Sequence, residues 1–418
     1  MLFFYRLSIY LYAFLVRIAA LFKPKARLFI DGRKDLLLEI KAKMAVETRP
    51  KIWMHCASLG EFEQGRPVLD SLRQQYPGHA LILTFFSPSG YQVRKKYQGV
   101  DYVFYLPLDK ASNAKQFVLD INPALAIFVK YDLWYFYLYE LKKKGIPVVL
   151  IDAIFRQQQG YFKWYGAIQR RMLRMLSHIF VQNESSGELL KTIGIDNYTV
   201  AGDTRFDRVL SVAETISPIH KIEALSQKYK LLIAGSTWAE DEQLLAEILP
   251  ALPPNWKLII VPHEVDEERI SSVVKLFSGR IKRWSSWQEN VNLDKQVLVV
   301  DTIGLLLKMY RYGTIAWIGG GLGSGGVHNV LEAAVYGLPC AYGPVHEKYQ
   351  EAIELVEKKG AVSCSNSKAF QTFFTQMEKD QIAYQQFAAA AQQYVLSKGG
   401  ATPVILRYLE EKNWLKVL

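Results

Sequence analysis

Residues 317–343 read WIGGGLGSGGVHNVLEAAVYGLPCAYG, and six of the eight positions from 319 to 326 are glycine. The apolar residues before the glycines predict a strand over 315–318, and those after them predict a helix over 327–336. Glycine costs backbone entropy, so a cluster this dense requires a reason. Such a turn lets the backbone approach a phosphate, which the free N–H groups at a helix start then bind.

The pattern differs from the two best-known phosphate-binding turns. It does not follow GxxxxGK[ST], and it lies too late in the chain to be the first turn of a dinucleotide-binding domain. In the predicted helix, Glu332 lies one turn after His328 on the same face. Its carboxylate can there accept two hydroxyl hydrogen bonds from a ribose. We therefore expect nucleotide or sugar-nucleotide binding, with glycines needed only for close packing as the alternative.

Strand-length apolar runs alternate with helical segments along most of the chain. The predicted strands cover 52–57, 80–85, 102–105, 125–129, 147–151, 179–181, 231–234, 258–261, 297–300 and 314–318, and the clearest helices 61–75, 111–119, 133–143, 165–176, 381–398 and 401–412. Continuously apolar strands alternating with helices are typical of parallel βαβ units. We predict an α/β protein of two Rossmann-like, doubly wound domains facing a cleft, with ligands at the carboxyl ends of the strands.

The domain limits follow from this alternation. We expect an anchoring helix over 1–24, a first domain over 25–215, a second over 216–395, and a C-terminal helical segment over 396–418 that packs back on the first domain. The first 22 residues are almost wholly apolar, interrupted by Arg6 and Arg17. A basic run follows them, containing Lys23, Lys25, Arg27, Arg33 and Lys34.

This N-terminal segment lacks the pattern of a cleaved signal peptide. A membrane-spanning arrangement would bury Arg17 at high cost. A helix lying in the bilayer interface, with its basic flank on anionic headgroups, fits the residues better. The alternative is a buried first helix of the domain. The basic flank predicts that the rest of the chain stays on the cytoplasmic side.

Charge and cysteine content restrict the possible functions. Lysine and arginine number 51 against 40 aspartate and glutamate, so the net charge is +11 and anionic partners are favoured. Nucleic acid is not expected among them, because no helix-turn-helix or RNP-type motif occurs. Cys56, Cys340 and Cys364 are far apart without a CxxC pair, so we expect three buried thiols rather than disulfides or a zinc site.

Two further strand-to-helix turns carry candidate site residues. In HCASLGEFEQG, residues 55–65, Ser58 and Gly60 lie at the turn and Glu61 at the predicted helix start. Glu61 serves there as a general base or merely as a helix cap, and both interpretations remain open. His55 is expected to be a half-buried histidine with its hydrogen bonds satisfied.

In AGSTWAEDE, residues 234–242, Ser236 and Thr237 are expected at a helix start, which would form an anion-binding turn. The strand that follows ends in VPHE, where His263 is exposed by position.

Six motifs in order resemble one known family. They are HCASLGE, VQNESSGELLKTIGI, GDTRFD, AGSTWAEDE, VPHE and GGGLGSGGVHNVLEAAVYGLPCAYGPVHEKYQEA, which together run from about residue 52 to 349. The chain resembles the 3-deoxy-D-manno-octulosonic acid (Kdo) transferases, inner-membrane glycosyltransferases of lipopolysaccharide synthesis. The resemblance implies a GT-B architecture, CMP-Kdo as donor, a lipid A precursor (lipid IVA) as acceptor, and inversion at the anomeric carbon. It also implies no metal, no cofactor and a location on the cytoplasmic face of the inner membrane.

The resemblance implies roles for particular residues. Glu61 is the expected catalytic base, and Glu332 the expected ribose ligand. The expected donor-binding set is Ser236, Thr237, His263, Gly321, Gly323, Gly325, Gly326, His328, Asn329 and Glu332. The expected acceptor or supporting set is Ser58, Gly60, Asp132 and Arg156.

The chain departs from the family pattern in three places. VKYDLW stands for an ETELW-type motif, with Lys130 at the first acid and Asp132 at the second. PHE replaces PRH, and IDAIFRQ retains only Arg156 of a longer segment. Two alternatives remain: another GT-B transferase using a UDP-sugar, and a non-enzymatic, membrane-associated anion-binding module. We expect a monomer that binds donor, acceptor and an anionic membrane surface.

Overall fold

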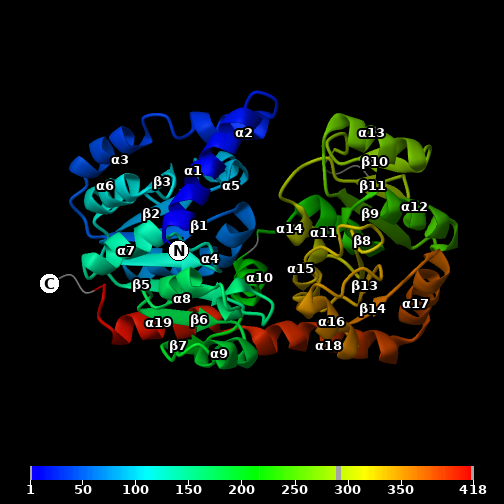
Figure 1. Cartoon of the computed structure of the whole chain (residues 1–418). Coiled ribbons are helices and arrows are strands. Elements are labelled where there is room, and N and C mark those ends of the chain that lie inside the picture. Colours follow the sequence, from blue (N-terminus) through cyan, green and yellow to red (C-terminus); the bar gives the residue numbers. More distant parts are fainter. Residues whose placement is uncertain (1, 216, 289–292, 416–418) are drawn as a thin grey trace. The chain divides into compact units, whose positions relative to one another are not determined.

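The computed structural model describes residues 2–215, 217–288 and 293–415. It divides into two compact units (Figure 1), of which unit 1 comprises Met1–Arg208 with Gly399–Leu418 and unit 2 comprises Val209–Lys398. Each unit contains one seven-stranded sheet in which every pairing is parallel. The prediction of two parallel α/β sheets is confirmed.

Unit 1 orders its strands β3-β2-β1-β4-β5-β6-β7. The strands are β1 Lys51–Cys56, β2 Ala80–Phe85, β3 Tyr102–Tyr105, β4 Leu125–Val129, β5 Val148–Ala153, β6 His178–Val181 and β7 Tyr198–Val200. The helices are α1 Leu2–Ala19, α2 Pro24–Asp31, α3 Leu36–Ala45, α4 Leu59–Gln75, α5 Pro88–Arg94, α6 Ala111–Ile121, α7 Tyr135–Lys143, η1 Gly160–Phe162, α8 Ala167–Leu173, α9 Glu184–Lys191, α10 Thr204–Thr215 and α19 Ala401–Glu411.

Both faces of this sheet are buried, because strand side chains point alternately to the two sides. In β1, Trp53 packs with residues of α3, α6 and α7, whereas Ile52 and Met54 pack with α4 and α19. This explains why the strands read as continuous apolar runs rather than as an alternating pattern.

Unit 2 orders its strands β10-β11-β9-β8-β12-β13-β14. The strands are β8 Lys230–Thr237, β9 Trp256–Pro262, β10 Ile281–Arg283, β11 Val297–Val299, β12 Ile315–Ile318, β13 Cys340–Tyr342 and β14 Ala361–Ser363. The helices are α11 His220–Ser226, α12 Ala239–Ile248, η2 Leu249–Ala251, α13 Glu267–Leu276, α14 Leu306–Tyr310, α15 Leu331–Ala334, α16 Gln350–Glu357, α17 Ser367–Lys379 and α18 Gln381–Lys398.

Four strands were not predicted, namely β7, β10, β13 and β14, and each has three residues. A run of three residues carries too little periodicity to be distinguished from a loop. The cysteine prediction is confirmed, since Cys56, Cys340 and Cys364 are all buried and unpaired.

The division between the units differs in detail from the predicted boundary near residue 215. It falls between Arg208 and Val209, within α10. The C-terminal segment belongs to unit 1, where the N–H groups of Gly400 and Thr402 both donate to the Asp207 carboxylate at 2.6 Å. Leu409 packs in the same core cluster as α4.

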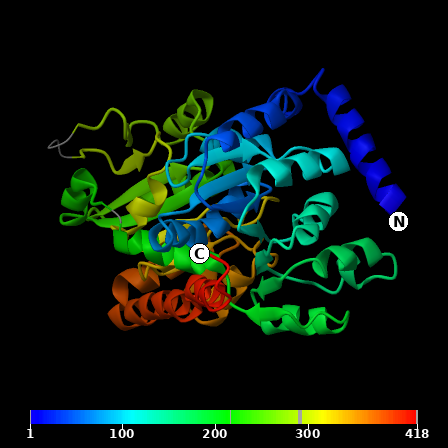
Figure 2. The same cartoon turned by 90° about the vertical axis from the view of Figure 1, so that its left-hand side faces the viewer.

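Helix α1 is largely exposed and lies along one side of unit 1 (Figure 2). Ile9 is its one buried residue, so the alternative of a buried first helix is wrong. Among the described residues, α1 is also the one helix with the length and composition needed to cross a membrane.

Candidate functional sites at the switch points of the two sheets

The strand order of unit 1 reverses between β1 and β4, which lie side by side in the sheet. At such a switch point the connections leave toward opposite faces, and the space beyond the strand ends is open for a ligand. Strand β1 is followed by Ser58, the N-cap of α4, and by Gly60 and Glu61 in the first turn of that helix, and the loop after β4 carries Lys130 and Asp132. The fold thus brings together two loops that are about seventy residues apart in sequence.

Glu61 lies in the first turn of α4, and its carboxylate accepts a short hydrogen bond from the N–H of Ala57. Ser58 is the N-cap of this helix and accepts from the Glu61 N–H at 3.4 Å. Both of the interpretations considered for Glu61 therefore have a structural basis: the side chain does stabilise the helix start. Burial, and then the negative charge of Asp132, raise the pKa of Glu61 above its ordinary 4.5. A partly buried carboxylate with a raised pKa is a stronger proton acceptor than a solvated one.

His55 connects this region to the sheet. The ring is fully buried, and its two nitrogens lie 2.9 Å from Thr84 Oγ1 and 2.9 Å from Asp132 Oδ2. The indole N–H of Trp134 also donates to Asp132 Oδ2 at 3.1 Å. Both ring nitrogens of His55 have hydrogen-bond partners, as predicted, but the ring is more deeply buried than expected. His55 holds Asp132, the carboxylate whose charge contributes to the raised pKa of Glu61.

The other residues predicted for this side are less constrained. Gly60 is exposed at the start of α4. A Cβ atom placed on it would have Ser58 Oγ, at 3.9 Å, as its nearest neighbour, so the position has room for a side chain. Arg156 is exposed in the loop after β5, where its N–H donates to Gln159. Lys130 has a positive φ of 61° at the end of β4. These residues lie at the same edge of the sheet as Glu61.

Unit 2 has a matching switch point between β8 and β12. Asp241, in the first turn of α12, joins the two turns that meet there. Its Oδ2 accepts from the N–H groups of Trp238 and Gly320, both at 2.9 Å, and its Oδ1 accepts from the Trp317 indole at 3.1 Å. The carboxylate is almost fully buried, which raises its pKa. One acidic side chain therefore holds the glycine turn against the loop that follows β8.

Three rings stack beside this carboxylate. Trp238 lies 4.8 Å from His263, and His263 lies 4.4 Å from His328, between ring centroids. The Trp238 indole donates to His328 Nε2 at 2.9 Å. Burial, with a contribution from His263, lowers the pKa of His328 to about 4, so the ring is neutral near pH 7 and accepts this bond. The structure thus brings together His263 and His328, both predicted as donor-binding residues, and adds Trp238, which was not predicted.

Ligand binding and close packing were the two interpretations of the glycine turn, and each applies to some of the glycines. A cavity of about 300 Å³ is lined by Trp238, Glu240, Gly320, Gly323, Ser324, Gly325, Gly326 and His328. Gly321 does not line it, because a Cβ there would lie 2.7 Å from the backbone nitrogen of Gly343. Gly321 is therefore a packing glycine, whereas Gly323 and Gly325 border open space. Gly326 lines the cavity and is also needed for packing, because its φ is 83° and a Cβ there would lie 2.7 Å from the Tyr349 ring.

The helix after the turn is much shorter than predicted. It spans Leu331–Ala334 instead of 327–336, so His328 precedes it and does not share a helical face with Glu332. The reason is the stack on Trp238 and His263, which fixes His328 in a non-helical segment. Glu332 instead accepts from the Asn329 side chain at 3.0 Å, and Asn329 in turn accepts from the Leu331 N–H.

The predicted anion-binding turn at Ser236 and Thr237 is also different. Strand β8 continues through Thr237, and α12 begins only at Ala239. The Thr237 hydroxyl is buried and donates to Glu242 at 2.8 Å, so it is not available to a phosphate. Ser236 has a positive φ of 52° in the strand end that packs on Gly319. The small residues here permit close packing of the two turns.

Sequence reasoning missed Trp238, Glu240 and Asp241, although all three stand in the quoted motif AGSTWAEDE. An available signal was the run of three acidic residues in the first turn of α12, Glu240, Asp241 and Glu242. Acidic residues are ordinary at helix starts, so the run alone does not reveal which carboxylate is buried.

Comparisons with known proteins agree with this fold. A family model described as 3-deoxy-D-manno-octulosonic-acid transferase (kdotransferase) matches residues 34–208. The 3-deoxy-D-manno-octulosonic acid transferase of Haemophilus influenzae is 29% identical over 334 residues, which cover 76% of this chain and 76% of that protein. The protein of the same name from Aquifex aeolicus is 27% identical over 317 residues, covering 74% of this chain and 80% of that one.

Among solved structures, UDP-GlcNAc 2-epimerase from Neisseria meningitidis bound to UDP-GlcNAc has a TM-score of 0.62 at 16% identity, covering 86% of this chain and 100% of that chain. At this identity the likeness concerns the fold alone. Two parallel seven-stranded sheets in one chain place the protein among GT-B-like folds.

Proposed function

We propose that this chain transfers Kdo from CMP-Kdo to the lipid A precursor lipid IVA. The chain belongs to the Kdo transferase family and is a glycosyltransferase of lipopolysaccharide synthesis. The transfer proceeds with inversion and without a metal or cofactor. The observation that carries the proposal is Glu61, a partly buried carboxylate with a raised pKa at the switch point of unit 1. The chemistry divides between the units: unit 1 supplies the base and unit 2 holds the donor.

The base mechanism follows from the environment of Glu61. An acceptor hydroxyl gives its proton to the carboxylate while its oxygen forms a bond to the anomeric carbon of Kdo. The bond from that carbon to the phosphate oxygen breaks on the opposite face, and CMP leaves with the bonding electrons. Asp132 supports this step because its charge raises the pKa of Glu61, and His55 keeps Asp132 in place.

Backbone groups of the glycine turn support the donor half of the proposal. Within the part of the chain that the structure describes, no acceptor is present for the N–H groups of Ser324, Gly325 and Gly326, which line the cavity. Consecutive free N–H groups bind anions. We assign the CMP phosphate to them, because neutral His328 cannot supply a positive charge. Glu332, oriented by Asn329, is the proposed ribose ligand.

Nucleotide choice distinguishes the main alternative, a GT-B transferase that uses a UDP-sugar. Titration of the purified protein with CMP is expected to raise its melting temperature, because a ligand at a hundred times its Kd stabilises the folded state by about 2.7 kcal/mol. UDP at the same concentration is expected to have little effect. Stabilisation by UDP but not by CMP would assign the chain to the alternative.

We further propose that α1 lies in the cytoplasmic interface of the inner membrane. One face of the helix packs on unit 1: the Tyr5 hydroxyl donates to Asp109, and the Tyr12 ring contacts Phe29 edge-to-face. The other face exposes apolar side chains to solvent, namely Leu7, Leu11, Phe14, Leu15 and Ile18. A helix packed on one side and apolar on the other suits an interfacial position.

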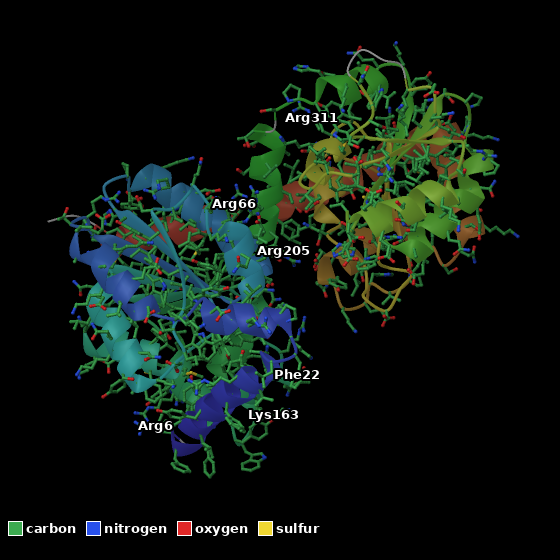
Figure 3. The ribbon with its side chains drawn as sticks, turned by 90° about the horizontal axis from the view of Figure 1, so that it is seen from above. Arg6, Phe22, Arg66, Lys163, Arg205 and Arg311 are labelled. Atoms are coloured by element: carbon green, nitrogen blue, oxygen red, sulfur yellow. The ribbon has the colours of Figure 1, made fainter. Side chains whose placement is uncertain are left out.

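The loop between η1 and α8 extends this apolar surface. Trp164 is 90% exposed and Tyr165 57% exposed. Figure 3 labels Lys163 in this loop and shows it on the same side of unit 1 as Arg6 of α1 and Phe22. Exposed tryptophan and tyrosine beside basic residues are typical of protein surfaces that contact the headgroup region of a bilayer.

Trp164 therefore provides a test of the membrane contact. Trp164→Ser is expected to weaken binding to phosphatidylglycerol vesicles about tenfold, since burial of a large aromatic side chain contributes roughly 1.5–3 kcal/mol. Sedimentation with the vesicles measures the effect. Leu119→Ser on α6, which also removes an exposed apolar side chain, is the matched control. Equal binding by both variants would show that the loop does not touch the bilayer.

A further inference from the structure

A cavity of about 410 Å³ lies between α1 and the body of unit 1. Its wall is mainly apolar, with Ala13, Val16, Phe29, Ile30, Leu36, Leu37, Leu38, Pro107 and Leu108 among the lining residues. The rest of the wall is polar and mostly basic, comprising Arg17, Arg33, Lys34, Lys110, Asp35 and Asn113. Four cations against one carboxylate give the cavity a positive potential, and its apolar wall suits hydrocarbon.

Arg33 is a fixed positive charge in this wall. Its guanidinium donates to the carbonyls of Leu106 at 2.9 Å, Phe29 at 3.0 Å and Phe86 at 2.7 Å. It also lies 3.7 Å from the centre of the Phe29 ring. Among the described residues no carboxylate forms an ion pair with it. Burial lowers the pKa of Arg33 to about 10, so it stays charged near pH 7 and favours an anion nearby.

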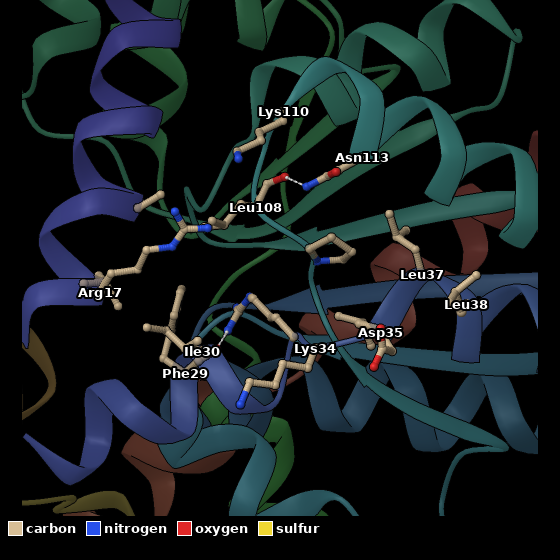
Figure 4. A pocket seen from close by; sticks show the side chains of 15 residues that line it. Arg17, Phe29, Ile30, Lys34, Asp35, Leu37, Leu38, Leu108, Lys110 and Asn113 are labelled. Carbon is tan, nitrogen blue, oxygen red and sulfur yellow. Dashed lines mark hydrogen bonds between the residues drawn. The ribbon is translucent and has the colours of Figure 1, made fainter. Parts of the chain in front are cut away.

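Two more cations reach the cavity, and neither is paired with a carboxylate among residues 2–215, 217–288 and 293–415. In Figure 4, Arg17 extends from α1 toward Leu108, and Lys110 approaches the same space from the loop before α6. Lys110 lies over the ring of Tyr10 at 4.8 Å, and within the described chain Arg17 makes no hydrogen bond or ion pair. Lys34, at the lower edge of the view, is already paired with Asp31 at 2.6 Å.

We propose that this cavity binds the phosphate headgroup of an anionic glycerophospholipid, with Arg17 and Lys110 on the phosphate and the apolar wall around the first part of the acyl chains. The proposal rests on the membrane association proposed above. Phe14 and Ile18, next to the cavity-lining residues of α1, are exposed and provide an apolar exit for the chains. A volume near 410 Å³ suits one headgroup with the start of its chains and is too small for a tetraacylated disaccharide.

Monomeric short-chain lipids test the site without a membrane. Isothermal titration of the full chain with dihexanoylphosphatidylglycerol, below its micelle concentration, is expected to show saturable binding, and dihexanoylphosphatidylcholine much weaker binding. Arg17→Gln with Lys110→Gln is expected to weaken phosphatidylglycerol binding about thirtyfold, since each cation near an anionic headgroup contributes roughly five- to sixfold. An unchanged melting temperature checks that this double variant is folded.

The control removes the same amount of charge from α2, a helix that contacts α1. Lys25→Gln with Arg27→Gln changes two exposed residues of α2 that do not line the cavity, so binding is expected to be unchanged. Equal losses in both double variants, or equal binding of the two lipids, would overturn the proposal. So would displacement of the short-chain lipid by lipid IVA, which would assign the cavity to the acceptor. Failure here would leave vesicle binding through Trp164 and stabilisation by CMP intact, so the proposals are tested separately.

Discussion

Glu61→Gln is expected to lower kcat about 10²- to 10⁴-fold, the usual contribution of a general base. Glutamine can still accept the hydrogen bond from Ala57, so the helix start remains capped. CMP binding, measured by thermal shift, is expected to be unchanged, because the groups proposed to bind CMP lie in unit 2. This variant thus separates the two interpretations of Glu61: a residue that only caps would tolerate the change.

Glu63→Gln is the matched control for this substitution. Glu63 lies on the same helix, partly exposed, in ion pairs with Arg66, Arg94 and Arg208. Its replacement is expected to leave kcat within about a factor of three, because surface ion pairs contribute little. Comparable losses in both variants would indicate damage to α4 rather than loss of a base.

The pH dependence of kcat/KM provides a further test of the role of Glu61. In the proposed mechanism Glu61 acts as a carboxylate, so activity is expected to fall as pH decreases through the pKa of Glu61. Burial and Asp132 raise this pKa above 4.5, so the acidic limb should lie at higher pH than for a solvated glutamate. Asp132→Asn removes the negative charge and is expected to move the limb to lower pH. A limb that does not move would show that Asp132 does not influence the base.

Asp241→Ala is expected to destabilise unit 2 by about 3 kcal/mol or more and to abolish stabilisation by CMP. The substitution leaves three donors without an acceptor: the buried Gly320 N–H and Trp317 indole and the partly buried Trp238 N–H. The glycine turn would lose its connection to the loop after β8, and the cavity beside it would lose its shape. Urea denaturation and thermal shift with CMP measure the two effects.

Glu247→Ala provides the comparison on the same helix. Glu247 is exposed on α12, so its removal is expected to change stability by no more than about 0.5 kcal/mol. Asp241→Asn is expected to fall between the two alanine variants, because its amide oxygen can replace only one carboxylate oxygen as an acceptor. If Asp241→Ala bound CMP like the unchanged protein, the glycine turn would not depend on this carboxylate.

Much of the secondary structure could be predicted because its signal is local. Strands β2, β3 and β4 have the predicted limits, and Ser58 and Glu61 stand where a helix start was expected. Burial on both faces of a parallel sheet makes its central strands continuously apolar, and such an apolar run can be recognised in the amino-acid sequence. Strands of three residues, such as β13 and the edge strand β14, are too short to carry such a run.

The candidate sites could be predicted from the sequence only in part. Glu61, His263, His328 and the glycine turn were predicted as site residues from motifs, because strand-to-helix turns of parallel sheets carry ligand-binding residues. The structure places them at the carboxyl ends of the strands, and their roles stay predictions. The predicted helix from 327 was wrong, since helical periodicity does not reveal that His328 stacks on Trp238 and His263. Thr237 was assigned to a phosphate, although its hydroxyl is bound to Glu242.

The amino-acid sequence by itself determined the alternation of strands and helices, the glycine turn at 319–326, the free cysteines and the apolar, basic N-terminus. Only the tertiary structure decided which strand ends are neighbours, and hence that Asp132 acts on Glu61 and that Asp241 holds Gly320. The physical reason is that parallel strands pair through backbone hydrogen bonds that carry no side-chain label. Strand order therefore depends on packing over the whole unit, and so does the partner of each buried carboxylate.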